Sequence, residues 1–239
     1  MSIYTFHTRV SYHDIDENMQ LTLQGAMSCM QEAAILHADQ VGNSIADLSQ
    51  TRLIWMLVQW HVKLTGEAAW NDCVDVLTWP RSMERLTSVR NFELRSAAGS
   101  TVAVGSSNWV LVHADTGRVS RITPEIAALY DLTPRDVFEE PLPKAPHGLG
   151  EERFAGKVLR RDLDTNHHVN NLVYLDYARE ALPDDIAAQS FREVSVYYHK
   201  QLLLGEPLHC YYHTDGGRHV VNICGDNAAN LHATVVFSE

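Results

Sequence analysis

Apolar residues along the chain recur with two different periods, and the change of period divides the sequence into elements. Over residues 21–41 they recur at the spacing of a helix, and Gly42 follows as a natural stop. After residue 51 the sequence changes to runs rich in Val, Trp, Thr and Leu that alternate in places, as strands do. We therefore predict a strand over residues 3–12 and the long helix, followed by four strands over residues 55–64, 74–81, 87–96 and 101–114.

The second half of the chain repeats this order of elements. A strand is predicted near residues 156–161, then a helix over residues 171–182 that Pro183 ends. Four further strands are predicted over residues 193–203, 208–214, 218–224 and 231–237. Prolines and glycines gather between the two halves and indicate a linker. We thus predict an N-terminal repeat over residues 1–132, a linker over 133–155 and a C-terminal repeat over 156–239.

The predicted order of elements is typical of an α+β fold. In each half a strand is followed by a helix and then by a meander of four strands. Each helix has one apolar stripe to bury, and a curved antiparallel sheet offers the surface for it. Direct similarity between the halves supports a duplication, because residues 10–33 align with 158–181 without a gap at a constant offset of 148. Gln20 of the first repeat faces His168 of the second. Only the second repeat keeps an imidazole there, so we predict that the chemistry belongs to the second repeat.

Composition excludes several classes of function. The net charge of −11 argues against binding of nucleic acid or of an anionic membrane, and the apolar fraction of 45% supports a packed core. The four cysteines form no CxxC pair and the 13 histidines no HExxH motif, so we expect no metal and no cofactor. The first ten residues lack the apolar run of a signal peptide, and no apolar stretch is long enough to span a bilayer. We expect a cytoplasmic protein.

Residues 162–171, DLDTNHHVNN, followed by Tyr174, resemble the DxDxNxHVNNxxY signature of the acyl-acyl carrier protein (acyl-ACP) thioesterases. The first repeat resembles this family too, in residues 11–34, in 70–79 and in 107–122. The resemblance covers most of residues 8–214. It implies a double hotdog fold, in which two tandem repeats each wrap a curved antiparallel sheet around a central helix. It also implies release of free fatty acid from acyl carrier protein, the partner that holds the acyl chain on its phosphopantetheine.

Carried over to this sequence, the family motif implies a catalytic group of Asp164, Asn166 and His168. The family usually has a Glu, and plant members also a Cys, after the Tyr of the next strand, where this chain has Gln201 and Leu202. We keep Gln201 in the predicted site because its amide can hold a water, although it cannot accept a proton. The resemblance also suggests an acyl tunnel in the N-terminal repeat, with walls that include Met27, Met30 and Met56.

Thioester hydrolysis needs an activated water and a place for the negative charge that grows on the carbonyl oxygen. Asp164, Asn166 and His168 alternate by two, so an extended segment would place them on one side. Asp164 is the first candidate for general base or water orienter, and Asn166 for positioning the water or the carbonyl. His168 is the candidate to polarise the carbonyl or to protonate the leaving thiolate. Backbone N–H groups of Val169 and Asn170, at the start of the second helix, would add an oxyanion site.

Structural roles remain open for several of these residues. Asp16 and Asn18 survive in the repeat that lacks the histidine, so Asp164 and Asn166 are also candidates for purely structural hydrogen bonding. Asp162 has the same ambiguity, since Asp14 faces it. We further expect an exposed His167, a helix cap at Asn170 or Asn171, and a fallback catalytic carboxylate at Glu180 on the second helix.

Other functions remain open as well: an acyl-CoA thioesterase, a non-catalytic acyl-binding hotdog protein, or a dehydratase-like relative. An acidic carrier protein needs a basic contact surface on an acidic enzyme. Two sets of basic residues are candidates: Arg81, Arg85, Arg90 and Arg95, or Arg118, Arg121, Lys157, Arg160 and Arg161. The sequence leaves acyl chain length, saturation and a homodimer undecided.

Overall fold

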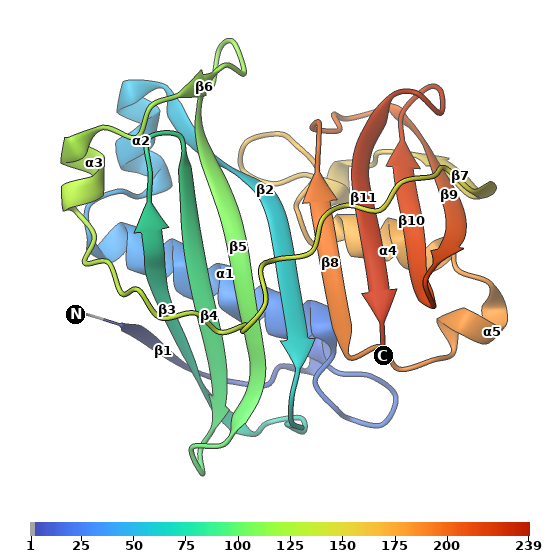
Figure 1. Ribbon diagram of the computed structural model, residues 1–239, viewed down its shortest axis with the longest axis horizontal. Helices are drawn as coiled ribbons and strands as arrows, with labels where there is room; N and C mark the ends of the chain where they lie inside the picture. The colour runs from blue at the N-terminus through green and yellow to red at the C-terminus, as the bar shows by residue number, and fades with distance from the viewer. Residues whose placement is uncertain (1–2) are drawn as a thin grey trace. The chain divides into compact units, whose positions relative to one another are not determined.

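The computed structural model describes residues 3–239 and divides into two compact units, Met1–Leu142 and Pro143–Glu239. Each unit combines one antiparallel sheet with a central helix that lies against it (Figure 1). The boundary between the units falls inside the predicted linker.

The first unit begins with β1 (Tyr4–Arg9), a 3₁₀ turn η1 (Tyr12–Asp14) and α1 (Leu23–Gln40). Its four long strands follow: β2 (Leu53–Leu64), β3 (Cys73–Met83), β4 (Thr87–Ser96) and β5 (Thr101–His113). The strand order within the unit is β1-β3-β4-β5-β2, and the short β6 (Val119–Ser120) also pairs with β5. The simple meander that we predicted is therefore wrong for β2. The chain crosses the sheet after β2, so that β2 pairs with β5 and not with β3.

The second unit contains β7 (Glu151–Lys157), η2 (Arg160–Asp162), α4 (Val173–Glu180) and four further strands: β8 (Glu193–Tyr198), β9 (Pro207–Asp215), β10 (Arg218–Cys224) and β11 (Leu231–Ser238). Its strand order is β8-β11-β10-β9-β7. In chain order, β7 to β11 correspond to β1 to β5. With these counterparts the order of the second unit becomes β2-β5-β4-β3-β1, which is the order of the first unit reversed. Two units of one topology confirm the duplication that the sequence alignment predicted.

Three short helices escaped prediction: α2 (Ile45–Thr51), α3 (Pro124–Ala128) and α5 (Asp184–Ala187). The predicted strand near residues 156–161 is also misplaced. β7 starts at Glu151, directly after Gly150, whose φ of +93° is a conformation open to glycine. The chain then makes the turn η2. β8 ends at Tyr198, so Gln201 and Leu202 lie in a loop and not on the strand that we predicted.

Helix α1 forms the inner layer of the first unit. Its first turn is capped by the Thr22 hydroxyl, which accepts a hydrogen bond from the Gly25 N–H at 3.0 Å. Met27 and Met30 are fully buried. Gly105 of β5 lets the helix approach closely, because an added Cβ there would lie 2.8 Å from the Met30 sulfur.

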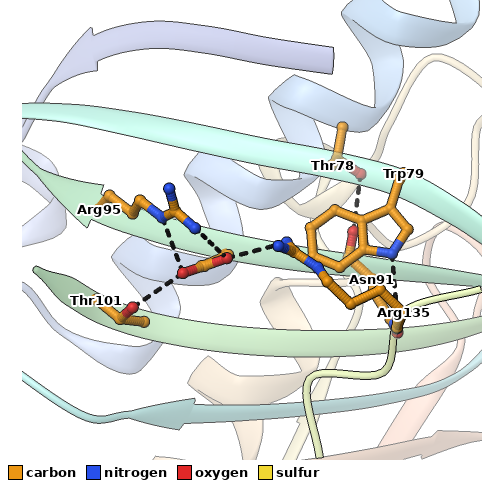
Figure 2. A network of polar contacts seen from close by, with 7 residues as sticks. Thr78, Trp79, Asn91, Arg95, Thr101 and Arg135 are labelled. Atoms are coloured by element: carbon orange, nitrogen blue, oxygen red, sulfur yellow. Dashed lines mark hydrogen bonds and ion pairs between the residues drawn. The ribbon is translucent and has the colours of Figure 1, made fainter. Parts of the chain in front are cut away.

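The first part of the predicted linker is bound to the sheet of the first unit (Figure 2). The Arg135 guanidinium lies 4.0 Å from the centre of the Trp79 ring and donates to Glu93 at 3.0 Å. Glu93 also accepts from Arg95 at 2.8 and 3.0 Å and from Thr101 at 2.9 Å. Burial alone would raise the pKa of Glu93, but these hydrogen bonds and the two guanidinium charges outweigh it and lower the pKa. Arg135 thereby holds the chain after α3 on the strands β3 and β4.

The last part of the predicted linker is bound to the second unit. Tyr197 donates to the Pro143 carbonyl at 2.9 Å. Asn222 donates to the carbonyls of Gly148 and Leu149 at 2.9 and 3.1 Å.

Between residues 3 and 239, no helix has the length and apolar character needed to cross a membrane.

Candidate active site

The signature residues form a closed loop between η2 and α4, which we name the motif loop (residues 164–168). One Asp164 carboxylate oxygen accepts the backbone N–H groups of Asn166 at 2.8 Å and His168 at 3.2 Å. The Asp164 N–H donates to the His168 carbonyl at 2.8 Å, and His167 sits at the turn with φ of +62°. Our expectation of an extended segment is wrong, because these bonds fold the segment back on itself. Asp164, Asn166 and His168 are nevertheless half-buried, whereas Thr165 and His167 between them are exposed.

The first unit contains the same loop at residues 16–20. One Asp16 carboxylate oxygen accepts from Asn18 and Gln20, both at 2.9 Å. The Asp16 N–H donates to the Gln20 carbonyl at 2.8 Å, and Met19 has the φ of His167, +62°. The carboxylate therefore closes the loop whether or not an imidazole follows it.

A second segment supports the motif loop, and we name it the support segment (residues 201–206). Leu203 forms a β-bridge with His168, and the Leu202 carbonyl accepts the Val169 N–H at 3.0 Å. The Leu202 N–H donates to the buried Tyr174 hydroxyl at 3.2 Å, and the Leu203 N–H to the Glu206 carboxylate at 2.9 Å. The backbone of His168 is thus held by Asp164 of its own loop and by Leu203 of the support segment.

The first unit has an equivalent support segment at residues 67–72. Gln20 bridges Ala69, and the Leu21 N–H donates to the Ala68 carbonyl at 2.8 Å. The Ala69 N–H donates to the Asp72 carboxylate at 2.8 Å, as Leu203 does to Glu206. By this register Glu67 is the counterpart of Gln201. The carboxylate that the second unit lacks is present, exposed, in the unit without the histidine.

Burial and neighbouring charges shift the pKa of His168. Burial lowers the pKa of its imidazole, the Asp164 charge opposes that effect, and His167 adds to it. The net shift is downward, so the imidazole is neutral at pH 7 and able to accept a proton.

The backbone oxyanion site that we predicted is wrong. The Val169 N–H donates to Leu202 and the Asn170 N–H donates to the Asp162 carbonyl at 2.8 Å, so both groups are occupied. The helix cap that we predicted at Asn170 or Asn171 is wrong. The N-cap of α4 is Leu172, which makes no side-chain capping bond, and the Asn170 side chain accepts the Leu172 N–H at 3.0 Å in the turn before the helix. The Asp162 carboxylate accepts from the Tyr177 hydroxyl and the Leu159 N–H, both at 2.7 Å, which fits a structural role.

The remaining predicted residues lie outside the motif loop. Glu180 is exposed on α4, and its counterpart Glu32 is exposed on α1. Met27 and Met30 are fully buried beneath the sheet of the first unit, whereas Met56 is half-buried on β2. Gln201 is half-buried at the start of the support segment. Within residues 3–239, no group of three or more His, Cys, Asp or Glu side chains is placed to hold a metal ion.

Comparison with known families decides the relationship of the chain. The acyl-ACP thioesterase N-terminal domain matches residues 2–130, and the acyl-ACP thioesterase C-terminal domain matches residues 151–232. The chain belongs to the acyl-ACP thioesterase family. The family assignment from residues 162–174 and the first repeat is therefore confirmed.

A curated relative carries the name of this family. Oleoyl-acyl carrier protein thioesterase 2 of Arabidopsis thaliana, a chloroplastic protein, is 29% identical over 74% of this chain and 53% of its own length. The chain thus spans about half the length of the curated relatives it matches.

Two solved structures superimpose on nearly the whole chain. An acyl-ACP thioesterase from Bacteroides thetaiotaomicron has a TM-score of 0.86 at 19% identity, covering 98% of this chain and 96% of that one. The 12:0-ACP thioesterase from Umbellularia californica has a TM-score of 0.84 at 22% identity, covering 99% and 96%. At this low sequence identity the two structures are evidence for the fold alone. They confirm the predicted double hotdog fold.

Sequence reasoning missed two side chains that contact the support segment or the residue before it. Glu206 accepts the Leu203 N–H, and the Nδ1 of His232 lies within hydrogen-bond distance of the Lys200 and Gln201 carbonyls. For Glu206 a sequence signal existed, because the dipeptides Asn71-Asp72 and Gly205-Glu206 each place an acid directly after a residue type that favours turns. His232 had none, since its partners lie about 30 residues away.

Proposed function

We propose that this protein hydrolyses fatty acyl-ACP thioesters to free fatty acid and carrier thiol. The observation that carries the proposal is His168, a half-buried neutral imidazole in a loop whose counterpart in the first unit has Gln20. Membership of the acyl-ACP thioesterase family supports the substrate class.

The mechanism that we propose assigns the proton transfers to His168 and leaves Asp164 as its support. His168 takes a proton from a water whose oxygen bonds to the thioester carbon. The carbonyl oxygen then carries the negative charge, toward which the Asn166 side-chain amide donates a hydrogen bond. When the carbonyl reforms, the carbon–sulfur bond breaks and His168 returns the proton to sulfur. The Asp164 charge stabilises the transient imidazolium, and Gln201 holds the water by hydrogen bonding.

We further propose that acyl carrier protein, which is acidic, contacts the basic residues beside the motif loop. Lys157, Arg160 and Arg161 are exposed there. The Arg161 side chain is 84% accessible, and its Nε lies 3.7 Å from the Asp162 carboxylate, a longer separation than the 2.9 and 2.8 Å of the ion pairs of Arg81 and Arg95. Their counterparts in the first unit are Arg9, Tyr12 and His13, so the charges of Arg160 and Arg161 occur only beside the histidine.

The other predicted basic set fits less well. Arg90 is buried, whereas Arg81 is paired with Asp136 and Arg95 with Glu93. Arg85 is exposed, but the burial of Arg90 and the ion pairs of Arg81 and Arg95 reduce the positive charge that this set presents to a partner. The cytoplasmic location stays a prediction of the sequence, and the sequence leaves a homodimer undecided.

The test is thiol release by the purified protein from matched acyl-ACP and acyl-CoA substrates of several chain lengths. We expect free thiol from acyl-ACP in multiple turnovers, with lower kcat/KM on the same chain attached to CoA. Equal or better turnover of acyl-CoA would favour the CoA thioesterase. Binding without thiol release, or a double bond formed in a 3-hydroxyacyl substrate, would contradict hydrolysis.

A further inference from the structure

The second unit contains a buried imidazole, His232 of β11, that the proposed chemistry does not use. It is 1% exposed, and its Nδ1 lies 2.9 Å from the Gln201 carbonyl oxygen and 3.2 Å from that of Lys200. Carbonyl oxygens only accept hydrogen bonds, so Nδ1 carries the proton and donates it. The Nε2 atom is buried and has no hydrogen-bond partner within the described chain.

Backbone hydrogen bonds identify the counterpart of His232 in the first unit. The His232 carbonyl accepts the N–H groups of His199 at 2.8 Å and Lys200 at 3.2 Å. The Val102 carbonyl accepts those of Thr65 at 2.9 Å and Gly66 at 3.0 Å. Val102 thus occupies the place of His232, just as Glu67 occupies that of Gln201. A valine side chain makes no hydrogen bond, so the contact from imidazole to carbonyl belongs only to the unit that carries His168.

The carbonyls that His232 holds lead directly into the support segment. Gln201 is followed by Leu202, whose carbonyl accepts the Val169 N–H, and by Leu203, which bridges His168. We propose that His232 is a positioning residue for the hydrolysis. It fixes Lys200 and Gln201 and thereby the support segment, whose Leu203 bridges His168. This inference rests on the proposed function and adds a residue to it.

The unpartnered Nε2 supports a functional reading over a merely stabilising one. Burying a polar atom without a partner is unfavourable, and an apolar side chain at this place avoids that cost. The first unit has Val102 there and keeps the same backbone register. Stability alone therefore does not call for an imidazole at this position.

The first test is the variant His232→Val, which gives the second unit the residue of the first. We expect kcat to fall about 10- to 100-fold through a displaced His168, with KM changed by less than about threefold. His232→Asn places an amide N–H near the position of Nδ1 and should recover most of the loss. Thr234→Val is the matched control, because it removes another buried hydrogen bond of β11, from Thr234 to Asn222 at 2.9 Å, away from the support segment. Its kcat should equal that of the wild type.

The second test measures how firmly the Val169 N–H is held by the support segment, and it does not depend on enzyme activity. Amide hydrogen exchange at Val169, whose N–H is bound by Leu202, should become at least about tenfold faster in His232→Val, because its acceptor is less fixed. Gly225→Ala should act in the same direction, since its Cβ would lie 2.4 Å from the Asn230 side-chain nitrogen and 2.8 Å from the His232 Nε2, so that both side chains have to move.

These results separate the two proposals. A wild-type protein that releases no thiol would refute the hydrolysis, while Val169 exchange would still report on positioning. Unchanged Val169 exchange together with unchanged kcat in a folded His232→Val would overturn the positioning role, and so would a loss of kcat that His232→Asn fails to reduce.

Discussion

At the scale of single residues, the two units separate structure from chemistry. Asp16 and Asp164 each accept two backbone N–H groups of their own loop, but only the second loop continues into a histidine. A carboxylate that two loops share is explained by loop closure alone. The histidines at 168 and 232, present in one unit only, require another explanation, which the proposed hydrolysis supplies.

Substitutions of the two aspartates test this division. Asp164→Asn keeps an oxygen that accepts both N–H groups, so kcat should fall only about tenfold through the lost charge. Asp164→Ala removes the acceptor and should lower kcat by about 100-fold or more. Asp16→Ala should destabilise the fold by about 1–3 kcal/mol and leave kcat of the folded protein unchanged. Steady-state kinetics and urea denaturation measure both effects. Equal inactivity of Asp164→Asn and Asp164→Ala would instead make Asp164 the proton acceptor.

At the scale of elements, the sequence predicts those parts whose boundaries are marked by local signals. The strands β4 and β10 match their predicted ranges, because turn sequences such as Ala97-Ala98-Gly99 bound them. The motif loop was misjudged as extended, since side-chain bonds to its own backbone override the alternation. The pairing of His232 with Gln201 joins distant residues, which neither periodicity nor propensity encodes.

The packing of α1 on β4 has a consequence for stability at low pH. His37 of α1 is buried, and its Nδ1 accepts from the Arg90 guanidinium at 2.9 Å, as Tyr4 and Tyr130 pack around the ring. Burial and then the Arg90 charge lower the pKa of His37 to about 4. The unfolded state, with an ordinary pKa near 6.5, binds more protons than the folded state between pH 6.5 and 4. Stability should therefore fall as the pH drops through this window, by up to about 3 kcal/mol from His37.

The variant His37→Asn tests this prediction, because its amide oxygen can accept from Arg90 near the position of Nδ1 but does not titrate. Urea denaturation at pH 7.5 and pH 5 should show a smaller loss of stability in the variant than in the wild type. Other histidines with lowered pKa, such as His168, will keep some dependence. The same loss in both proteins would show that His37 does not titrate in this window.

At the scale of the whole molecule, an acidic chain is proposed to act on an acidic carrier. The net charge of −11 repels such a partner at long range, so a local basic surface has to dominate at contact. Composition indicated that such a surface was needed. The structure was required to choose among the arginines, since burial of Arg90 and pairing of Arg81 are invisible in the sequence.

Charge reversal tests this surface. Arg160→Glu with Arg161→Glu should raise KM for acyl-ACP about tenfold and leave kcat within about twofold, since these side chains attract the carrier and not the reacting atoms. The exposed pair Arg118 and Arg121 of the first unit, reversed in the same way, is the matched comparison. If only that second pair raised KM, the carrier would dock on the first unit instead.

The central claim, that the second unit acts through His168, is tested most directly by single-turnover thiol release from acyl-ACP by His168→Gln. Gln20 shows that the loop accommodates glutamine without a change in its hydrogen bonds, so the variant should fold as the wild type does. We predict a rate at least about 100-fold below that of the wild type, while Gln20→Ala keeps the wild-type rate. A folded His168→Gln protein that releases thiol at the wild-type rate would contradict the account.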